Sequence, residues 1–559
     1  MVPKTSCSTN CLSWEVSDRC RWLLAIAVAV MAVAASAQVD FGKGVTLSGS
    51  VHSEVLVPQT DSVIGSQRGD DRVLTNTYVD LSLASQAVDA GLRFEFTQYP
   101  LPGFEPDFEG WGVPNVWVKG KFRKVELTLG SVYDQFGSGF IFRTYEQRSL
   151  GVDNSILGVR AVGRFGGATL KAITGRQRRY WEWNKAWLTG VDAELDLDHW
   201  SAAMREHNAH LMLGGSWVNK RESEEKLMVD ATHKLRLPVY VNAWDARVRF
   251  QKGGFSSLLE YAGKTQDPTF DNGYTYRPGH VEMLSLSYSR SGVSALLQAK
   301  RSERMSFRSR RSMSGLSSMV NHLPAFAMEH TYTLPALYPY ATHAEGEWAY
   351  QAEVSCLLKK GSTLGGKYGT KVRLHFSHIH ALDIPDGTVV MGEDGPAAPY
   401  WRWGDDTYYQ DFNIQFERKL SRSVKLNLMY MNQRFNKAAV AGGTVRSHIV
   451  VGEVRWNVSR RVTLRGEAQY LATRDDQGDW LYGLLELSLA PQWMFTVSDL
   501  YNSGDTGVHY YQALATYNVK SHRIQAGYVR NRAGYNCSGG VCRYVPASRG
   551  LTITYNYNF

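Results

Sequence analysis

Apolar and polar residues alternate one by one along most of the chain. The clearest case is the C-terminal stretch, where one set of alternate positions is apolar or aromatic: Leu551, Ile553, Tyr555, Tyr557 and Phe559. The same two-residue period recurs at 45–57, 92–96, 125–129, 246–250, 372–376, 424–430 and 462–467. Because successive side chains of a strand point to opposite faces, this pattern predicts strands with one apolar face. No convincing helical period follows residue 37, so we predict an all-β protein.

The segments between these strands fall into short and long connections that alternate along the chain. The long ones are 99–114, 132–155, 177–188, 219–242, 264–279, 301–346, 381–406, 435–446 and 532–548. Transmembrane β-barrels of the outer membrane have short periplasmic turns and long external loops. A sheet can cross lipid only when it closes, because every backbone polar group needs a partner there. The alternation therefore predicts a transmembrane outer-membrane β-barrel.

We expect residues 38–559 to form one barrel of about 24 antiparallel strands, within a range of about 20–26. The last strand should pair with the first, near residues 45–57. The 16 Trp, 30 Tyr and 21 Phe suit the aromatic girdles of such barrels. A soluble all-β fold is the alternative, but a propeller would need a fixed repeat that the sequence lacks. Barrels of this width are usually plugged.

The N-terminus carries the signature of export. An apolar run from Trp22 to Ala34 follows Arg19 and Arg21 and precedes Ala35-Ser-Ala37. It is shorter than the roughly 20 residues of a spanning helix, so we predict a signal peptide over residues 1–37. An uncleaved anchor is the alternative. The predicted location is the outer membrane of a Gram-negative bacterium, in contact with its lipid and lipopolysaccharide.

The segment 132–155 mixes aromatic and charged residues and is the candidate lumen loop. Its candidate contacts are Tyr133, Phe136, Phe140, Arg143 and Arg148. An external loop this apolar would form an adhesive surface patch, so we predict that it folds into the lumen. An ordinary external loop is the alternative.

Two basic clusters are candidate contacts for the lumen or for a partner. One comprises Arg176, Arg178 and Arg179, and the other comprises Arg301, Arg304, Arg308, Arg310 and Arg311 in the expected longest external loop, 301–346. Guanidinium groups of this kind attract anions, lipopolysaccharide phosphates or a protein. The alternative is that they are solvated or ion-paired. Despite a formal net charge of +9, the basic residues are scattered, so we expect no nucleic-acid partner.

Cys537 and Cys542 flank a short Gly-containing stretch and are the predicted disulfide pair of an exported chain. Two free thiols are the alternative, and Cys356 has no assigned role. The terminal aromatic positions Tyr555, Tyr557 and Phe559 resemble the C-terminal signal by which barrels reach the barrel assembly machinery.

Motifs for catalysis are incomplete. The stretch 361–368 approaches a phosphate-binding loop, but Tyr368 replaces the Ser or Thr that would hold Mg²⁺. His378 and His380 share one strand face and His375 lies on the other, which disfavours a three-ligand metal site. We therefore predict no enzyme activity, metal or cofactor.

Three stretches resemble an outer-membrane β-barrel family of unknown function in Bacteroidota: 100–114, 133–143 and 534–546. The resemblance implies the barrel fold, and some relatives are associated with type IX secretion. The leading hypothesis is thus an accessory or scaffold in protein secretion or surface assembly, with secretion-system proteins as partners. The alternatives are an anion-favouring porin or substrate-specific channel, and a barrel-borne surface enzyme.

Overall fold

The computed structural model describes residues 39–559, except for positions 41, 43, 70–72, 386–388 and 438–442. The predicted signal peptide, residues 1–37, lies outside the described residues.

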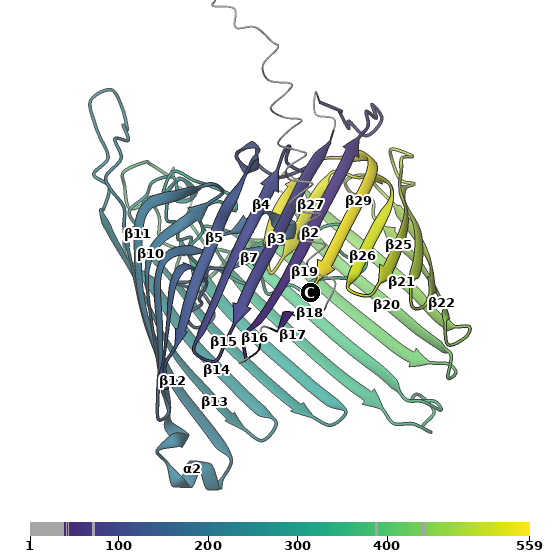
Figure 1. Ribbon diagram of the computed structural model, residues 1–559, viewed down its shortest axis with the longest axis horizontal. Coiled ribbons are helices and arrows are strands. Elements are labelled where there is room, and N and C mark those ends of the chain that lie inside the picture. Colours follow the sequence, from purple (N-terminus) through teal and green to yellow (C-terminus); the bar gives the residue numbers. More distant parts are fainter. Residues whose placement is uncertain (1–38, 41, 43, 70–72, 386–388, 438–442) are drawn as a thin grey trace, which may run out of the picture.

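A single antiparallel sheet forms the wall of the molecule (Figure 1). Its first twelve wall strands are β2 (Thr46–Pro58), β3 (Leu74–Ala84), β4 (Val88–Thr97), β5 (Gly110–Lys121), β6 (Val125–Val132), β9 (Ile156–Phe165), β10 (Ala168–Arg179), β11 (Glu182–Asp196), β12 (Ala209–Arg221), β13 (Tyr240–Lys252), β14 (Phe255–Lys264) and β15 (Gly279–Arg290). The others are β16 (Val293–Glu303), β17 (Gly346–Leu358), β18 (Thr370–Leu382), β19 (Trp403–Lys419), β20 (Val424–Asn436), β21 (Thr444–Asn457), β22 (Val462–Ala472), β23 (Trp480–Leu489), β24 (Trp493–Asn502), β25 (His509–Val519), β26 (His522–Asn531) and β29 (Ser548–Asn558).

The sheet closes on itself, which confirms the predicted barrel. Strand β29 pairs with β26 on one side and with β2 on the other, in register from Ser50 opposite Asn558 to Pro58 opposite Gly550. The closed wall has 24 strands, as expected. The last residue is also held, because Phe559 and Gly49 exchange backbone hydrogen bonds of 3.0 and 2.9 Å.

The smaller elements precede the first wall strand or connect the wall strands in sequence. They are β1 (Val39–Asp40), η1 (Pro106–Phe108), β7 (Glu146–Gln147), η2 (Arg148–Leu150), β8 (Val152–Asp153), η3 (Leu197–His199), α2 (Ala202–Glu206), η4 (Phe270–Asn272), β27 (Gly534–Ser538) and β28 (Val541–Val545). Among the described residues, none of the helices is long and apolar enough to span a bilayer.

The two faces of the wall differ in polarity. On β6, Leu127 and Leu129 are 37% and 50% exposed, whereas Thr128 between them is 7% exposed. Leu485 on β23 is 72% exposed. Exposed apolar side chains outside and buried polar ones inside are what a barrel in lipid requires. The alternation read from the sequence therefore corresponds to lipid-facing and lumen-facing positions.

The connections at the two ends differ in length. At one end the chain turns within two residues, as between β13 and β14 or between β15 and β16. That end also carries the connection 197–208 with η3 and α2, seen below the strands in Figure 1. The long connections lie at the opposite end, the external end in barrels of this class.

One expected long loop is absent from the external end. Residues 177–188 do not form a loop, because β10 continues to Arg179 and β11 begins at Glu182, and these two residues pair. An irregularity between Arg176 and Arg178 accommodates two extra residues on β11, because these residues pair with Trp187 and Trp183. The cross-strand pairing extends almost to the tip of this hairpin.

Two connections fold into the lumen. The first inner segment, 133–155, joins β6 to β9, and the second inner segment, 304–345, joins β16 to β17. Phe136, Phe140 and Phe142 of the first are 0–1% exposed, and they belong to one apolar cluster with residues of the second such as Phe307 and Leu334. The sequence suggested a lumen position for 132–155 but an external one for 301–346. The apolar side chains of the second segment draw it inward as well.

Candidate functional site

Buried ion pairs fasten the first inner segment to the wall. Arg93 on β4 lies 2.6 Å from Glu146 and 3.1 Å from Asp153 of the segment, and 2.7 Å from Asp80 on β3. Arg148 bridges Glu146 and Asp80 at 2.5 and 2.8 Å. Each charge thus has a partner, as buried charges require.

Arg178 completes this network from β10. Its guanidinium lies 2.6 Å from Glu95 and 2.5 Å from Asp153, and the residue is 3% exposed. Tyr133 donates a hydrogen bond of 2.9 Å to Asp153 and accepts one of 3.1 Å from Asn115. Four strands, β3, β4, β5 and β10, therefore share one set of polar contacts with the segment.

The remaining residues of the first cluster take different positions. Arg176 is exposed on the outer face, with its guanidinium carbon 5.8 Å from the Trp187 ring. Arg179 lies 2.9 Å from Asp107. Arg143, a candidate contact of the first inner segment and not of this cluster, packs over the Tyr145 ring at 4.6 Å. The irregularity and the turn separate side chains that are neighbours in sequence.

The arginines of the second cluster are held by separate partners rather than gathered into one basic surface. Arg301 pairs with Glu303 at 2.7 Å, Arg308 with Asp271 at 2.5 Å and Arg311 with Glu222 at 3.1 Å. Arg304 donates hydrogen bonds to the Thr275 hydroxyl and the Asp394 carbonyl. Arg310 is half-buried. These contacts favour the ion-paired interpretation of the cluster.

The histidine and cysteine candidates are also placed. His375 is buried on the inner face of β18, and His378 and His380 lie on the outer face with ring centroids 4.5 Å apart. In the described part of the chain, no histidine, cysteine and carboxylate side chains form a group that could hold a metal ion. Cys537 and Cys542 are joined in a disulfide, and Cys356 is a free, half-buried thiol on β17.

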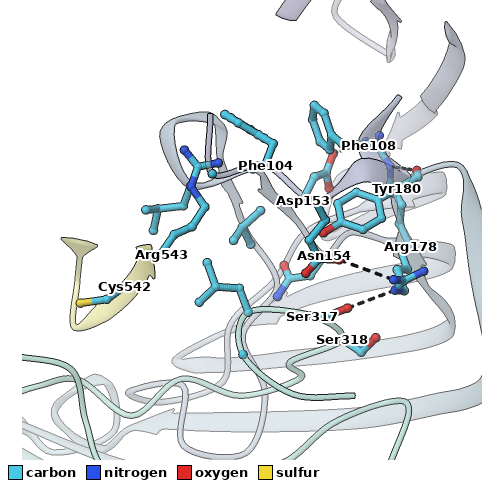
Figure 2. A pocket seen from close by; sticks show the side chains of 18 of the residues that line it. Phe104, Phe108, Asp153, Asn154, Arg178, Tyr180, Ser317, Ser318, Cys542 and Arg543 are labelled. Carbon is cyan, nitrogen blue, oxygen red and sulfur yellow. Dashed lines mark hydrogen bonds and ion pairs between the residues drawn. The ribbon is translucent and has the colours of Figure 1, made fainter. Parts of the chain in front are cut away.

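A cavity of about 230 Å³ opens among five segments at the external end (Figure 2). We call it the external cavity. Its walls come from 103–108, from the first and second inner segments, from the end of β10 with the following turn, and from β28. Its aromatic and cationic lining includes Phe104, Phe108, Tyr180, Arg178 and Arg543.

Sequence reasoning singled out Arg178 and Arg179 in this cavity but missed Arg543, Phe104 and Tyr180 as contacts. The Cys537–Cys542 pair and the family-like stretch 534–546 marked the hairpin that presents Arg543, but neither gave Arg543 a role. No sequence signal connects residue 104 with residue 543, although Arg543 lies over the Phe104 ring at 3.7 Å.

A second, polar cavity of about 390 Å³ lies beside the closing strands. It is lined by η2 and by residues of β2, β3 and β29, among them His52, Glu54 and Asn556. The inner segments therefore leave space next to this part of the wall.

The closed wall, its apolar exterior and its occupied lumen define an outer-membrane type of β-barrel. The chain belongs to the family of unknown function DUF6029, whose model matches residues 20–559. A search of curated proteins finds no match.

Solved structures with a similar course of the chain include a mutant of the ferric enterobactin receptor PfeA from Pseudomonas aeruginosa. That likeness has 10% identity and a TM-score of 0.42, and covers 92% of this chain and 80% of that one. The translocation pore of the P pilus usher PapC matches with 10% identity and a TM-score of 0.40, over 92% of this chain and 99% of that one. PapC in an E. coli P pilus tip assembly intermediate matches with a TM-score of 0.46 and 11% identity. The match covers 94% of this chain and 62% of that one.

Proposed function

We propose that this protein is a non-enzymatic accessory or scaffold for protein secretion or surface assembly in the outer membrane of a Gram-negative bacterium. The observation that carries the proposal is that two connections of the chain occupy its own lumen while three neighbouring external connections pack together. Such a barrel is better suited to holding partners than to free diffusion of solutes.

The second inner segment crosses the lumen and contacts strands far apart in the wall. His330 lies 2.7 Å from Asp411 on β19, and the backbone N–H of Leu334 donates to Gln469 on β22 at 2.9 Å. The first inner segment reaches the other side, where Ser138 donates to Glu260 on β14. Polar contacts to both sides of the lumen favour a fixed plug.

An exposed apolar surface at the external end offers a docking site. It is made by three neighbouring connections, and we call it the three-loop patch: Met228, Val229, Phe270, Val389 and Val390, which are 40–57% exposed. Beneath it Leu235, Leu237 and Tyr274 form a small buried cluster, which ties the connections together. Contiguous apolar surface of this kind is typical of protein-binding sites.

The sequence resemblance suggests which secretion system the barrel would serve, namely type IX secretion in Bacteroidota. Proteins of that system would then be its partners. The aligned Tyr555, Tyr557 and Phe559 would be read by the barrel assembly machinery during insertion. Lipid and lipopolysaccharide would surround the apolar exterior.

Affinity purification from detergent-solubilised outer membranes tests the proposal. The wild-type barrel should retain surface or secretion proteins, and the V229D/F270D double variant should lose them, because charges in the patch oppose apolar docking. Leu364→Asp is the matched control, since Leu364 is 72% exposed at the opposite end. Recovery of the barrel alone, together with normal secretion in a deletion strain, would contradict the proposal.

A substrate-specific channel is the second candidate, and the polar cavity beside β2 and β29 favours it. A solute path along these strands would give measurable conductance in planar bilayers without any deletion. The ion pairs of the two basic clusters leave little support for an anion-favouring lining.

A further inference from the structure

Arg543 differs from the other arginines that line the external cavity. Arg178 and Arg179 are ion-paired, with Glu95 and Asp107 respectively. Among the residues that the structure describes, Arg543 makes no ion pair. Its Nη2 donates to the Ser149 carbonyl at 3.0 Å, whereas Nε and Nη1 are buried and have no acceptor in the described chain.

The position of this guanidinium is fixed on several sides. The Phe104 ring lies 3.7 Å from its central carbon, which is the geometry of a cation–π contact. The Cys537–Cys542 disulfide closes the β27–β28 hairpin immediately before it. Figure 2 shows Arg543 and Phe104 on one side of the cavity, facing Tyr180 and Arg178 across it. Burial lowers the pKa of Arg543 to about 10, so it stays protonated at neutral pH.

Buried donors without acceptors are costly, and a charged donor is the costliest. Both nitrogens are closed off from the cavity as the side chain stands, so a small turn of Arg543 would bring Nε or Nη1 to an anion there, and the charge-assisted hydrogen bond would remove that cost. The cavity thus has both an unsatisfied cation and room for a small ligand.

The charge of the lining indicates which anion fits. Of the three guanidinium groups in the lining, those of Arg178 and Arg179 are already paired with carboxylates, so the charge of Arg543 is the one left to a ligand. One positive charge matches a monoanion better than a phosphate dianion. The apolar lining, from Phe104, Phe108, Leu150, Val152 and Leu316, matches an aromatic or aliphatic group next to that charge.

We propose that the external cavity binds a carboxylate attached to an apolar group, with Arg543 as its anchor. A free organic acid and the C-terminus of a peptide both have this chemistry. The inference is independent of the scaffold function, because a receptor or a channel could equally use the site.

Isothermal titration calorimetry on the full mature barrel in detergent tests this inference. N-acetylphenylalanine should bind, and its neutral amide should bind at least about tenfold more weakly, because the amide lacks the charge that Arg543 recognises. Phenyl phosphate should also bind more weakly than the acid. Equal binding of acid and amide, tighter binding of phenyl phosphate, or no detectable binding of the acid would each overturn the proposal.

Variants locate the site. Arg543→Gln should weaken N-acetylphenylalanine at least about tenfold, whereas Arg422→Gln, which removes the same charge from an exposed turn at the other end, should not. Leu316→Trp should weaken it by filling the cavity while leaving Arg543 in place. An unchanged affinity in either Arg543→Gln or Leu316→Trp would overturn the assignment, and a heat-modifiability gel verifies that each variant is folded.

A peptide pair distinguishes the two sources of the carboxylate. Binding of an acetylated tetrapeptide ending in phenylalanine, but not of its amidated form, identifies a site open to peptide C-termini. Binding of the small acid alone identifies a site for free organic acids. Either result supports the carboxylate site, and equal binding of the two peptides contradicts it.

Discussion

At the residue scale, aromatic burial holds the first inner segment inside the barrel. Phe136 is fully buried, and its ring lies 4.9 Å from that of Phe142. It also presses on the wall, since a Cβ built on Gly190 of β11 would come within 2.7 Å of the Phe136 ring. Glycine at position 190 is what lets this ring approach the strand.

Phe136→Ala should therefore lower the free energy of unfolding by about 3–5 kcal/mol, because it removes a buried ring and leaves a cavity. Guanidinium titration of the refolded barrel in detergent measures the change. Phe270→Ala is the matched control, since Phe270 is 57% exposed and should change stability by less than about 0.5 kcal/mol. Equal effects of the two substitutions would show that Phe136 is not packed as described.

The environment of a charged side chain also depends on its exact position in a strand. Arg176 and Arg178 are two residues apart on one strand, yet the first faces outward and the second is buried. The sequence grouped them in one basic cluster. It could not reveal the carboxylates of Glu95 and Asp153, which come from distant parts of the chain.

Arg178→Met should destabilise the barrel by about 3–5 kcal/mol, because it removes the closer cation of two buried carboxylates, Glu95 and Asp153, and leaves them to share Arg93. Arg176→Met, the control on the same strand, should have an effect below about 1 kcal/mol. The same denaturant titration compares them. A small effect of Arg178→Met would mean that other groups neutralise Glu95 and Asp153.

At the element scale, the external connection after β2 is clasped to the last strands. Asp61 lies 2.7 Å from Arg530 on β26 and 3.2 Å from Arg549 on β29. The hydrogen bond from Arg530 holds the pKa of Asp61 at about 2, below its usual value. We call these ion pairs of Asp61 with Arg530 and Arg549 the clasp. The clasp links the first external connection to the strands that close the barrel.

This clasp predicts a pH dependence. A carboxylate whose pKa is lowered on folding stabilises the protein above its unfolded pKa of about 3.9, and that stabilisation is lost as pH falls toward about 2. Asp61→Asn should thus lower the denaturant midpoint at pH 7, and the difference from wild type should shrink below about pH 4. A difference that stays constant with pH would show that the Asp61 charge has no such role.

At the scale of the whole molecule, the second inner segment decides whether the barrel is open. Glu303 and Gly346 are paired neighbours on β16 and β17, so a short linker can join these strands without it. Replacing residues 305–344 by a Gly-Ser linker should convert a poorly conducting barrel into one with stepwise conductance in planar bilayers, because the lumen of a wide barrel is then filled with water.

The matched control shortens an external connection in the same way. Arg221 and Tyr240 are also paired neighbours, and the connection 222–239 between β12 and β13 projects beyond the strand ends in Figure 1 (upper left). Its replacement by the same linker should leave conductance low. If wild type and the 305–344 deletion conduct equally, the second inner segment does not decide whether the lumen is open.

The sequence by itself determined the wall. Alternation is a local property, so it predicted the all-β barrel, the approximate strand number and the closure of Leu551–Phe559 on residues 45–57. The sequence did not predict the tight hairpin of β10 and β11. The charged and aromatic residues at 177–188 are typical of a loop, and only their cross-strand partners show that they form strands.

Only the tertiary structure decided what fills the barrel. The burial of 304–345, the partners of Arg178 and Arg308, and the meeting of Phe104 with Arg543 depend on contacts between residues far apart in the chain. A strand carries its own pattern because its two faces meet different solvents. A connection carries no such pattern, and its position depends on which apolar and charged groups the closed wall brings within reach.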